Sequence, residues 1–141
     1  VENLGKEFGA QCLVASIDCE YNNGIFVATK KNSFELTNHT LADAIKICAR
    51  LPIGEIYLNS IARDGTGNGL HLELLDHLPA NLSTPLIRMG GVGNSKLFVD
   101  GLRDSRVDAV ATANLLNFMG DGLSRARRTV INEGIDLANF D

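Results

Sequence analysis

Short apolar runs alternate with segments of helical periodicity along this chain of 141 residues, and this alternation restricts its fold more than any other feature. Four apolar runs are predicted strands, over residues 11–18, 55–60, 85–89 and 108–113. Apolar residues at helical spacing follow each of them, over residues 40–51, 70–82, 95–103 and 122–132. Such an order predicts an α/β fold with a parallel sheet and right-handed crossovers. We expect one domain over residues 1–141, with the tail of a helix at 1–8 and then four βα units.

The chain is too short for a complete eight-unit barrel, which needs at least ~200 residues. Four βα units are half of a TIM-type (βα)8 barrel. A half-barrel leaves two unpaired sheet edges and an uncovered inner face. Inner residues such as Val14, Tyr57 and Ile87 would then meet water in a monomer. We therefore expect the chain to form a homodimer or a higher homo-oligomer that completes a barrel.

Two loops of the kind that bind phosphate follow the last two predicted strands. The first is the glycine-rich segment 89–94, and the second is the segment 113–117, which contains Asn114. Glycine lets the backbone approach a ligand closely, and the N–H groups at a helix start attract anions. In (βα)8 barrels the last two βα loops often bind phosphate. These loops therefore predict one phosphate held between Gly90-Gly91 and Ala113-Asn114.

Further polar residues fall at or after the ends of the first two predicted strands, where barrel active sites lie. Asp18 ends the first strand in an otherwise apolar run, so it is either an acid–base group or a partner of a loop lysine such as Lys30. Asn59 ends the second strand. Asp64, in the loop 63–69, either binds a substrate hydroxyl or closes a turn. We expect Asp18 to face the inside of the barrel. In the second strand, Glu55 would then face inward together with Asn59, which is unusual for a glutamate without a partner.

Charge and cysteine content narrow the classes of partner. The net charge of −4 argues against a nucleic-acid surface, and no apolar run approaches the ~20 residues of a membrane span. Cys12, Cys19 and Cys48 lack metal-binding spacing, and an odd number of such thiols favours a reducing, cytoplasmic setting. We expect no metal and no cofactor. The irregular stretch 19–39 contains one hairpin signal, Asn22-Asn23-Gly24, followed by a second strand at 25–28.

Four segments resemble the cyclase subunit of imidazole glycerol phosphate synthase, an enzyme of histidine biosynthesis. They are 16–18, 54–66, 90–93 and 108–111, of which 54–66 is the most specific. The resemblance runs in order from Phe8 to about Phe118 and covers only the C-terminal half of that barrel, strands five to eight.

The resemblance implies a cyclase or lyase in which ammonia from a glutaminase subunit crosses the barrel and reacts with a phosphorylated nucleotide. Asp18 matches one of the two aspartates that act as acid and base, and the strand-one aspartate has no match in this chain. Glu55 falls at the ammonia gate. The implied phosphate and substrate residues are Asn59, Asp64, Gly65, Gly90, Gly91, Ala113 and Asn114.

The chain also departs from that family's pattern. Met89 and Asn114 stand where the family has serines, and Asn59 stands where it has a threonine. Asn59, together with Cys19, is closer to a paralogous branch thought to supply ammonia for amidino groups on surface-polysaccharide sugars. Two function classes therefore remain open. One is a cyclase or ammonia-transfer enzyme that works when oligomerised, and the other is a non-catalytic half-barrel that binds a sugar phosphate.

Overall fold

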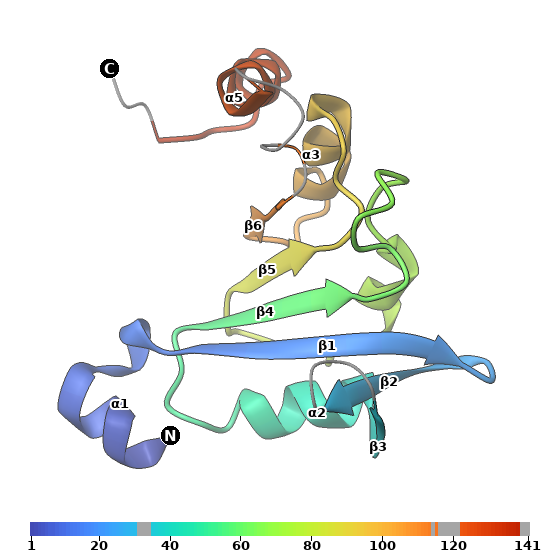
Figure 1. Ribbon diagram of the computed structural model, residues 1–141. Coiled ribbons are helices and arrows are strands. Elements are labelled where there is room, and N and C mark those ends of the chain that lie inside the picture. The colour runs from blue at the N-terminus through green and yellow to red at the C-terminus, as the bar shows by residue number, and fades with distance from the viewer. Residues whose placement is uncertain (31–34, 114, 116–121, 139–141) are drawn as a thin grey trace.

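The computed structural model describes residues 1–30, 35–113, 115 and 122–138. They form a six-stranded sheet in the order β3-β2-β1-β4-β5-β6 (Figure 1). The strands are β1 Val14–Asn22, β2 Ile25–Lys30, β3 Glu35–Thr40, β4 Glu55–Ser60, β5 Leu86–Met89 and β6 Ala109–Val110. The α-helices are α1 Glu2–Phe8, α2 Leu41–Cys48, α3 Ser95–Leu102 and α5 Gly122–Asn132, and the 3₁₀ helices are η1 Ala10–Cys12 and η2 Leu72–His77.

Four strands form the parallel part of the sheet, as the sequence predicts for half of a barrel. β1 pairs with β4, β4 with β5, and β5 with β6, all in parallel. The predicted hairpin is confirmed: β2 pairs antiparallel with β1, and Asn23 and Gly24 have φ of 49° and 90° at its turn. β3 extends this hairpin at the edge of the sheet. Its exposed, polar sequence has no apolar alternation, which explains why sequence patterning does not reveal it.

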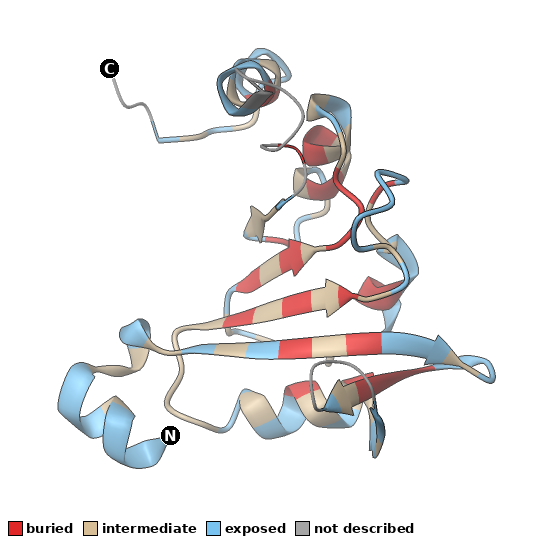
Figure 2. Ribbon diagram, viewed as in Figure 1, coloured by how far each residue is buried: buried red, intermediate tan, exposed pale blue. Residues whose placement is uncertain are grey.

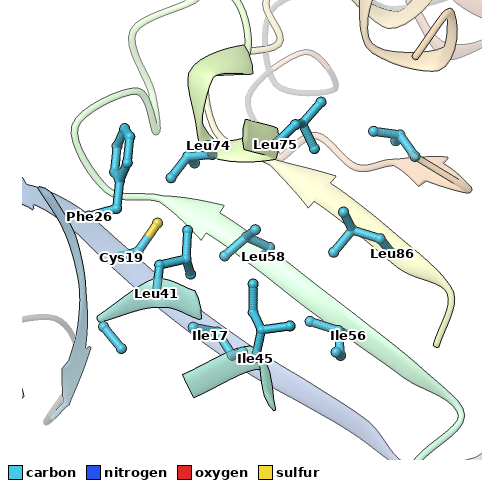
Figure 3. Close-up of a cluster of buried hydrophobic side chains, with 12 residues drawn as sticks. Ile17, Cys19, Phe26, Leu41, Ile45, Ile56, Leu58, Leu74, Leu75 and Leu86 are labelled. Atoms are coloured by element: carbon cyan, nitrogen blue, oxygen red, sulfur yellow. The ribbon is translucent and has the colours of Figure 1, made fainter. Parts of the chain in front are cut away.

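Side-chain alternation gives the parallel strands one buried face and one open face. Ile56, Leu58 and Ser60 of β4 are buried, whereas the residues between them are only half-buried (Figure 2). Ile17 and Cys19 of β1 are buried on the same side. Figure 3 shows how side chains of this face meet α2 and η2 in the main core. A second apolar cluster packs α3 against α5. Asp18 and Glu55 lie on the face opposite this core, so the prediction that both face the inside of the barrel is confirmed.

Several predicted boundaries were wrong. The sequence predicts the first strand at 11–18, but Ala10–Cys12 form a 3₁₀ helix and β1 runs from Val14 to Asn22. The last strand, predicted at 108–113, is only Ala109–Val110. The helix predicted over 70–82 is the short 3₁₀ helix Leu72–His77. It ends there because Pro79 disfavours helical backbone in the preceding residue, and Leu78 is extended with a ψ of 145°. α2 begins where expected, since the Thr40 hydroxyl accepts a hydrogen bond from the Asp43 N–H at 3.2 Å.

The parallel part of the sheet is open at both edges among the described residues. β2 pairs with only the Cys19–Asn22 end of β1, so Val14–Asp18 has a strand on one side alone. No described strand lies beyond β6 at the other edge. Val14 is 51% exposed, and Tyr57 and Ile87 on the same face are half-buried. The sheet is therefore an unclosed half of a barrel.

Candidate functional site

A pocket of about 150 Å³ opens where β4, β5 and β6 end. Three loops build it: the segment after β4, the glycine-rich segment after β5, and the segment after β6. It brings together five predicted residues, Asp64, Gly65, Gly90, Gly91 and Ala113. It also contains Thr66, Gly67, Met89, Val92, Gly93, Ala111, Thr112 and Leu115. Of the other two predicted phosphate and substrate residues, Asn59 does not line the pocket and Asn114 lies outside the described residues.

The loops after β4 and β5 pack backbone against backbone, which fixes the wall of the pocket. The Gly69 N–H donates a 2.8 Å hydrogen bond to the Gly91 carbonyl. A Cβ on Gly91 would overlap the Gly69 carbonyl oxygen, and one on Gly93 would lie 2.8 Å from the Gly67 Cα. Gly91 also has a φ of 96°, a conformation that other L residues rarely adopt. These glycines are therefore required by geometry, beyond any contact with a ligand.

Asp18 lies at the same edge of the sheet as the pocket but does not line it. In the β1–β4 register Asp18 is opposite Asn59, and the Asn59 side-chain N–H donates a hydrogen bond of 3.1 Å to the Asp18 carboxylate. The Asn59 Oδ1 atom is buried and has no hydrogen-bond partner among the described residues. Its amide is oriented by the carboxylate, because the opposite orientation would place two oxygens together. Lys30, the alternative partner considered for Asp18, lies 3.5 Å from the Glu35 carboxylate.

Tyr57 reaches the pocket wall from the open face of the sheet. Its hydroxyl donates a hydrogen bond to the sulfur of Met89, a pocket-lining residue. The pKa of Tyr57 is raised by burial first, and then by the negative charges of Asp64 and Asp18. The Tyr57 hydroxyl is therefore electrostatically coupled to both carboxylates. Motif comparison singles out neither Tyr57 nor its contact, because a tyrosine inside a strand reads as a core residue.

A buried arginine supports the loop after β4 from the core side of the sheet. Arg88 of β5 is fully buried, and its Nη2 donates a 3.0 Å hydrogen bond to the His71 carbonyl. Its Nε and Nη1 atoms have no hydrogen-bond partner among the described residues. Burial lowers the pKa of Arg88 to about 10. The His71 ring lies 3.3 Å from the Ser60 hydroxyl, so the end of the loop is fixed at two points.

Glu55 lies far from these groups along the strand. It is the first residue of β4, pairs in register with Val14, and is half-buried on the open face. The pocket and Asp18 lie at the other end of the strands, so the structure does not bring Glu55 close to either of them. Across the described parts of the chain, no group of three or more His, Cys, Asp or Glu side chains is arranged to hold a metal ion. No helix within those parts is long and apolar enough to cross a membrane.

An unclosed parallel sheet with a pocket at its carboxyl edge defines one half of a TIM-type barrel. Comparison with known proteins identifies the family. The family described as "Histidine biosynthesis protein" matches residues 1–120. The chain therefore belongs to this family and is a relative of the cyclase subunits of imidazole glycerol phosphate synthase.

The curated relatives are about twice as long as this chain. A putative imidazole glycerol phosphate synthase subunit hisF2 of Parasynechococcus marenigrum is 42% identical over 89% of this chain and 47% of its own length. Subunits HisF of Flavobacterium johnsoniae and Pyrobaculum aerophilum are 28% and 31% identical over 97% and 95% of this chain. The matches cover 55% and 53% of those two proteins. The chain thus spans about half the length of the relatives it matches.

Proposed function

We propose that this chain is one half of a cyclase-type barrel that uses ammonia on a phosphorylated nucleotide-type substrate, with Asp18 as its acid or base. The observation that carries the proposal is the position of Asp18. It lies at the same edge of the parallel sheet as a glycine-lined pocket, and Asn59 orients it. Phosphate in the pocket would place the reacting end of a substrate over the barrel mouth, where an aspartate can move a proton.

The pocket offers backbone groups rather than cations to a phosphate. Gly65, Gly90 and Gly91 line it with positive φ, so their N–H groups can turn toward a ligand without a side chain in the way. Asn94, directly after this wall, caps α3 by accepting a hydrogen bond from the Leu97 N–H at 3.1 Å. The partial positive charge of that helix start lies close to the glycine loop and favours an anion.

Closure of the barrel by a second copy of the chain is part of the proposal. Two related copies can pair β6 of one with the open Val14–Asp18 edge of β1 in the other, at both junctions. This arrangement gives eight parallel strands, covers the exposed Val14, and brings two Asp18 carboxylates to one mouth. It also supplies the second phosphate pocket of a two-phosphate substrate. Helix α1 lies at the amino end of β1 (Figure 1), and its Leu4 and Phe8 are 48% and 56% exposed, which leaves apolar surface that a second copy could cover.

Glu55 would lie at the opposite end of such a barrel, where the family resemblance places an ammonia gate. A glutaminase subunit would dock at that face. Within the barrel, ammonia would pass Tyr57 and Met89 before reaching the mouth.

Turnover with ammonium tests the function directly. The assay mixes the protein with the phosphoribosyl-formimino nucleotide and an ammonium salt, and measures imidazole glycerol phosphate. We expect Asp18→Asn to abolish turnover and Asp136→Asn, at an exposed position, to leave it unchanged. Met89 favours the second candidate, a half-barrel that binds a sugar phosphate without chemistry, because a thioether cannot donate to phosphate. Binding without turnover by the wild-type protein would establish that candidate instead.

A further inference from the structure

The hydrogen bond from Tyr57 to Met89 joins a good donor to a poor acceptor. A thioether sulfur accepts hydrogen bonds weakly, whereas a phenol hydroxyl donates well. The methionine side chain is unbranched and adapts its shape at little cost. An oxygen atom that enters the pocket beside Met89 can therefore take over the Tyr57 hydroxyl without losing a strong interaction. The Tyr57 hydroxyl is therefore a strong donor beside the pocket that a ligand oxygen can bind in place of Met89.

The charges around Tyr57 specify which part of a ligand would contact it. Asp64 lines the pocket, and both Asp64 and Asp18 act electrostatically on the Tyr57 hydroxyl. Two carboxylates disfavour a phosphate beside Tyr57 and accept hydrogen bonds from hydroxyl groups. The glycine backbone of the same pocket suits the phosphate. The pocket thus offers glycine backbone to an anion and, beside Met89, the Tyr57 donor together with the Asp64 acceptor, which is the pattern that a phosphorylated, hydroxylated carbon chain satisfies.

We propose that Tyr57 is a specificity-determining residue, whose hydroxyl leaves Met89 and donates to a sugar hydroxyl when a phosphorylated sugar binds. This proposal rests on the proposed function, because it assumes that the glycine-lined pocket receives the phosphate. Tyr57 distinguishes a sugar phosphate from phosphate alone. It remains protonated at neutral pH and acts only as a donor and acceptor of hydrogen bonds.

Calorimetric titration of the intact protein with ribose 5-phosphate and, separately, with inorganic phosphate tests the assignment. Tyr57→Phe removes only the hydroxyl, and Tyr21→Phe at the exposed end of the hairpin is the matched control. We expect Tyr57→Phe to weaken ribose 5-phosphate about threefold to tenfold, the usual effect of one hydrogen bond. Inorganic phosphate should bind as before, and Tyr21→Phe should change neither affinity.

The other outcomes separate this proposal from the proposed function. If the wild type and Tyr57→Phe prefer ribose 5-phosphate over inorganic phosphate by the same factor, the role of Tyr57 is overturned. The proposal that the pocket binds phosphate would still stand. Equal weakening of both ligands overturns it as well, since it indicates a structural effect. Binding of neither ligand by the wild type overturns both proposals. Met89→Leu removes the weak acceptor at similar volume and should still prefer ribose 5-phosphate over inorganic phosphate. Loss of that preference in Met89→Leu would also contradict the assignment.

Discussion

The side-chain amide of Asn59 donates a hydrogen bond of 3.1 Å to the Asp18 carboxylate across the parallel pair of β1 and β4. This contact holds the candidate acid–base group in one orientation at the mouth of the half-barrel. It also makes Asn59 a positioning residue for Asp18, in the place of the threonine found in the resembled family.

Loss of this contact should lower the rate more than the affinity. Asn59→Leu removes the donor to a charged acceptor, an interaction worth about 1.5–3 kcal/mol. We expect kcat of the ammonium-dependent reaction to fall about tenfold or more, with a smaller change in KM, because the phosphate contacts remain. Steady-state kinetics of Asn59→Leu and of the exposed control Asn81→Leu would measure this. An unchanged kcat in Asn59→Leu would remove Asn59 from the account.

Close packing of the two glycine loops gives a prediction about stability. Gly91→Ala places a Cβ against the Gly69 carbonyl at a φ of 96°, whereas Gly24→Ala has a φ of 90° and no atom within 4 Å of its Cβ. The shared backbone strain is about 1–2 kcal/mol. Chemical denaturation should therefore show a larger loss for Gly91→Ala, by a further ~2 kcal/mol. Phosphate binding should be lost in Gly91→Ala alone. Equal losses would mean that the loops do not pack as described.

His71 gives a pH dependence with a defined sign. Burial is the first cause that lowers its pKa below the ordinary 6.5. Glu73 opposes the shift, and Arg63 and Arg88 add to it. As pH falls, His71 is protonated in the unfolded chain at a higher pH than in the folded chain. The contribution of His71 to the free energy of unfolding is therefore complete above pH 6.5 and is lost as pH falls toward the lower folded-state pKa.

The free energy of unfolding should thus decrease between about pH 7.5 and about pH 5.5, and less steeply in His71→Gln. Urea titrations at both pH values provide the measurement. His39→Gln, at an exposed histidine, should keep the wild-type slope. Identical slopes for the wild type and His71→Gln would contradict the assignment.

Arg88 is expected to reduce stability rather than increase it. Its guanidinium is fully buried, and its Nε and Nη1 have no partner among the described residues. Because its folded-state pKa is near 10, the cost of the buried charge is present at every pH below that value and is relieved only above it. Arg88→Met should raise the free energy of unfolding by about 1–3 kcal/mol. A loss of that size would instead show that the bond to the His71 carbonyl outweighs the desolvation.

Sequence patterning identifies the parts of this fold that depend on local periodicity. The parallel strands, α2, α3 and the hairpin turn at Asn23-Gly24 follow from apolar spacing, caps and turn residues. β3 could not be found in this way, because an exposed edge strand needs no apolar alternation. The helix expected at 70–82 ends early for a local reason, namely Pro79.

The candidate site divides in a similar way. Motif comparison places Asp64, Gly65, Gly90, Gly91 and Ala113 in one pocket, and the structure brings these five together. The roles of Tyr57 and Arg88 come from contacts with residues far away in the sequence, Met89 and His71, which no spacing encodes. The pairing of Asn59 with Asp18 needs the register of β1 against β4, which the sequence alone does not give.

Completion of the barrel by a second copy is the central claim, because it would bring a second Asp18 carboxylate across the mouth from the first. The most direct measurement is the mass of the protein in solution at micromolar concentration, determined by light scattering. The account predicts a mass of two chains or a multiple of two. A mass equal to one chain would contradict it.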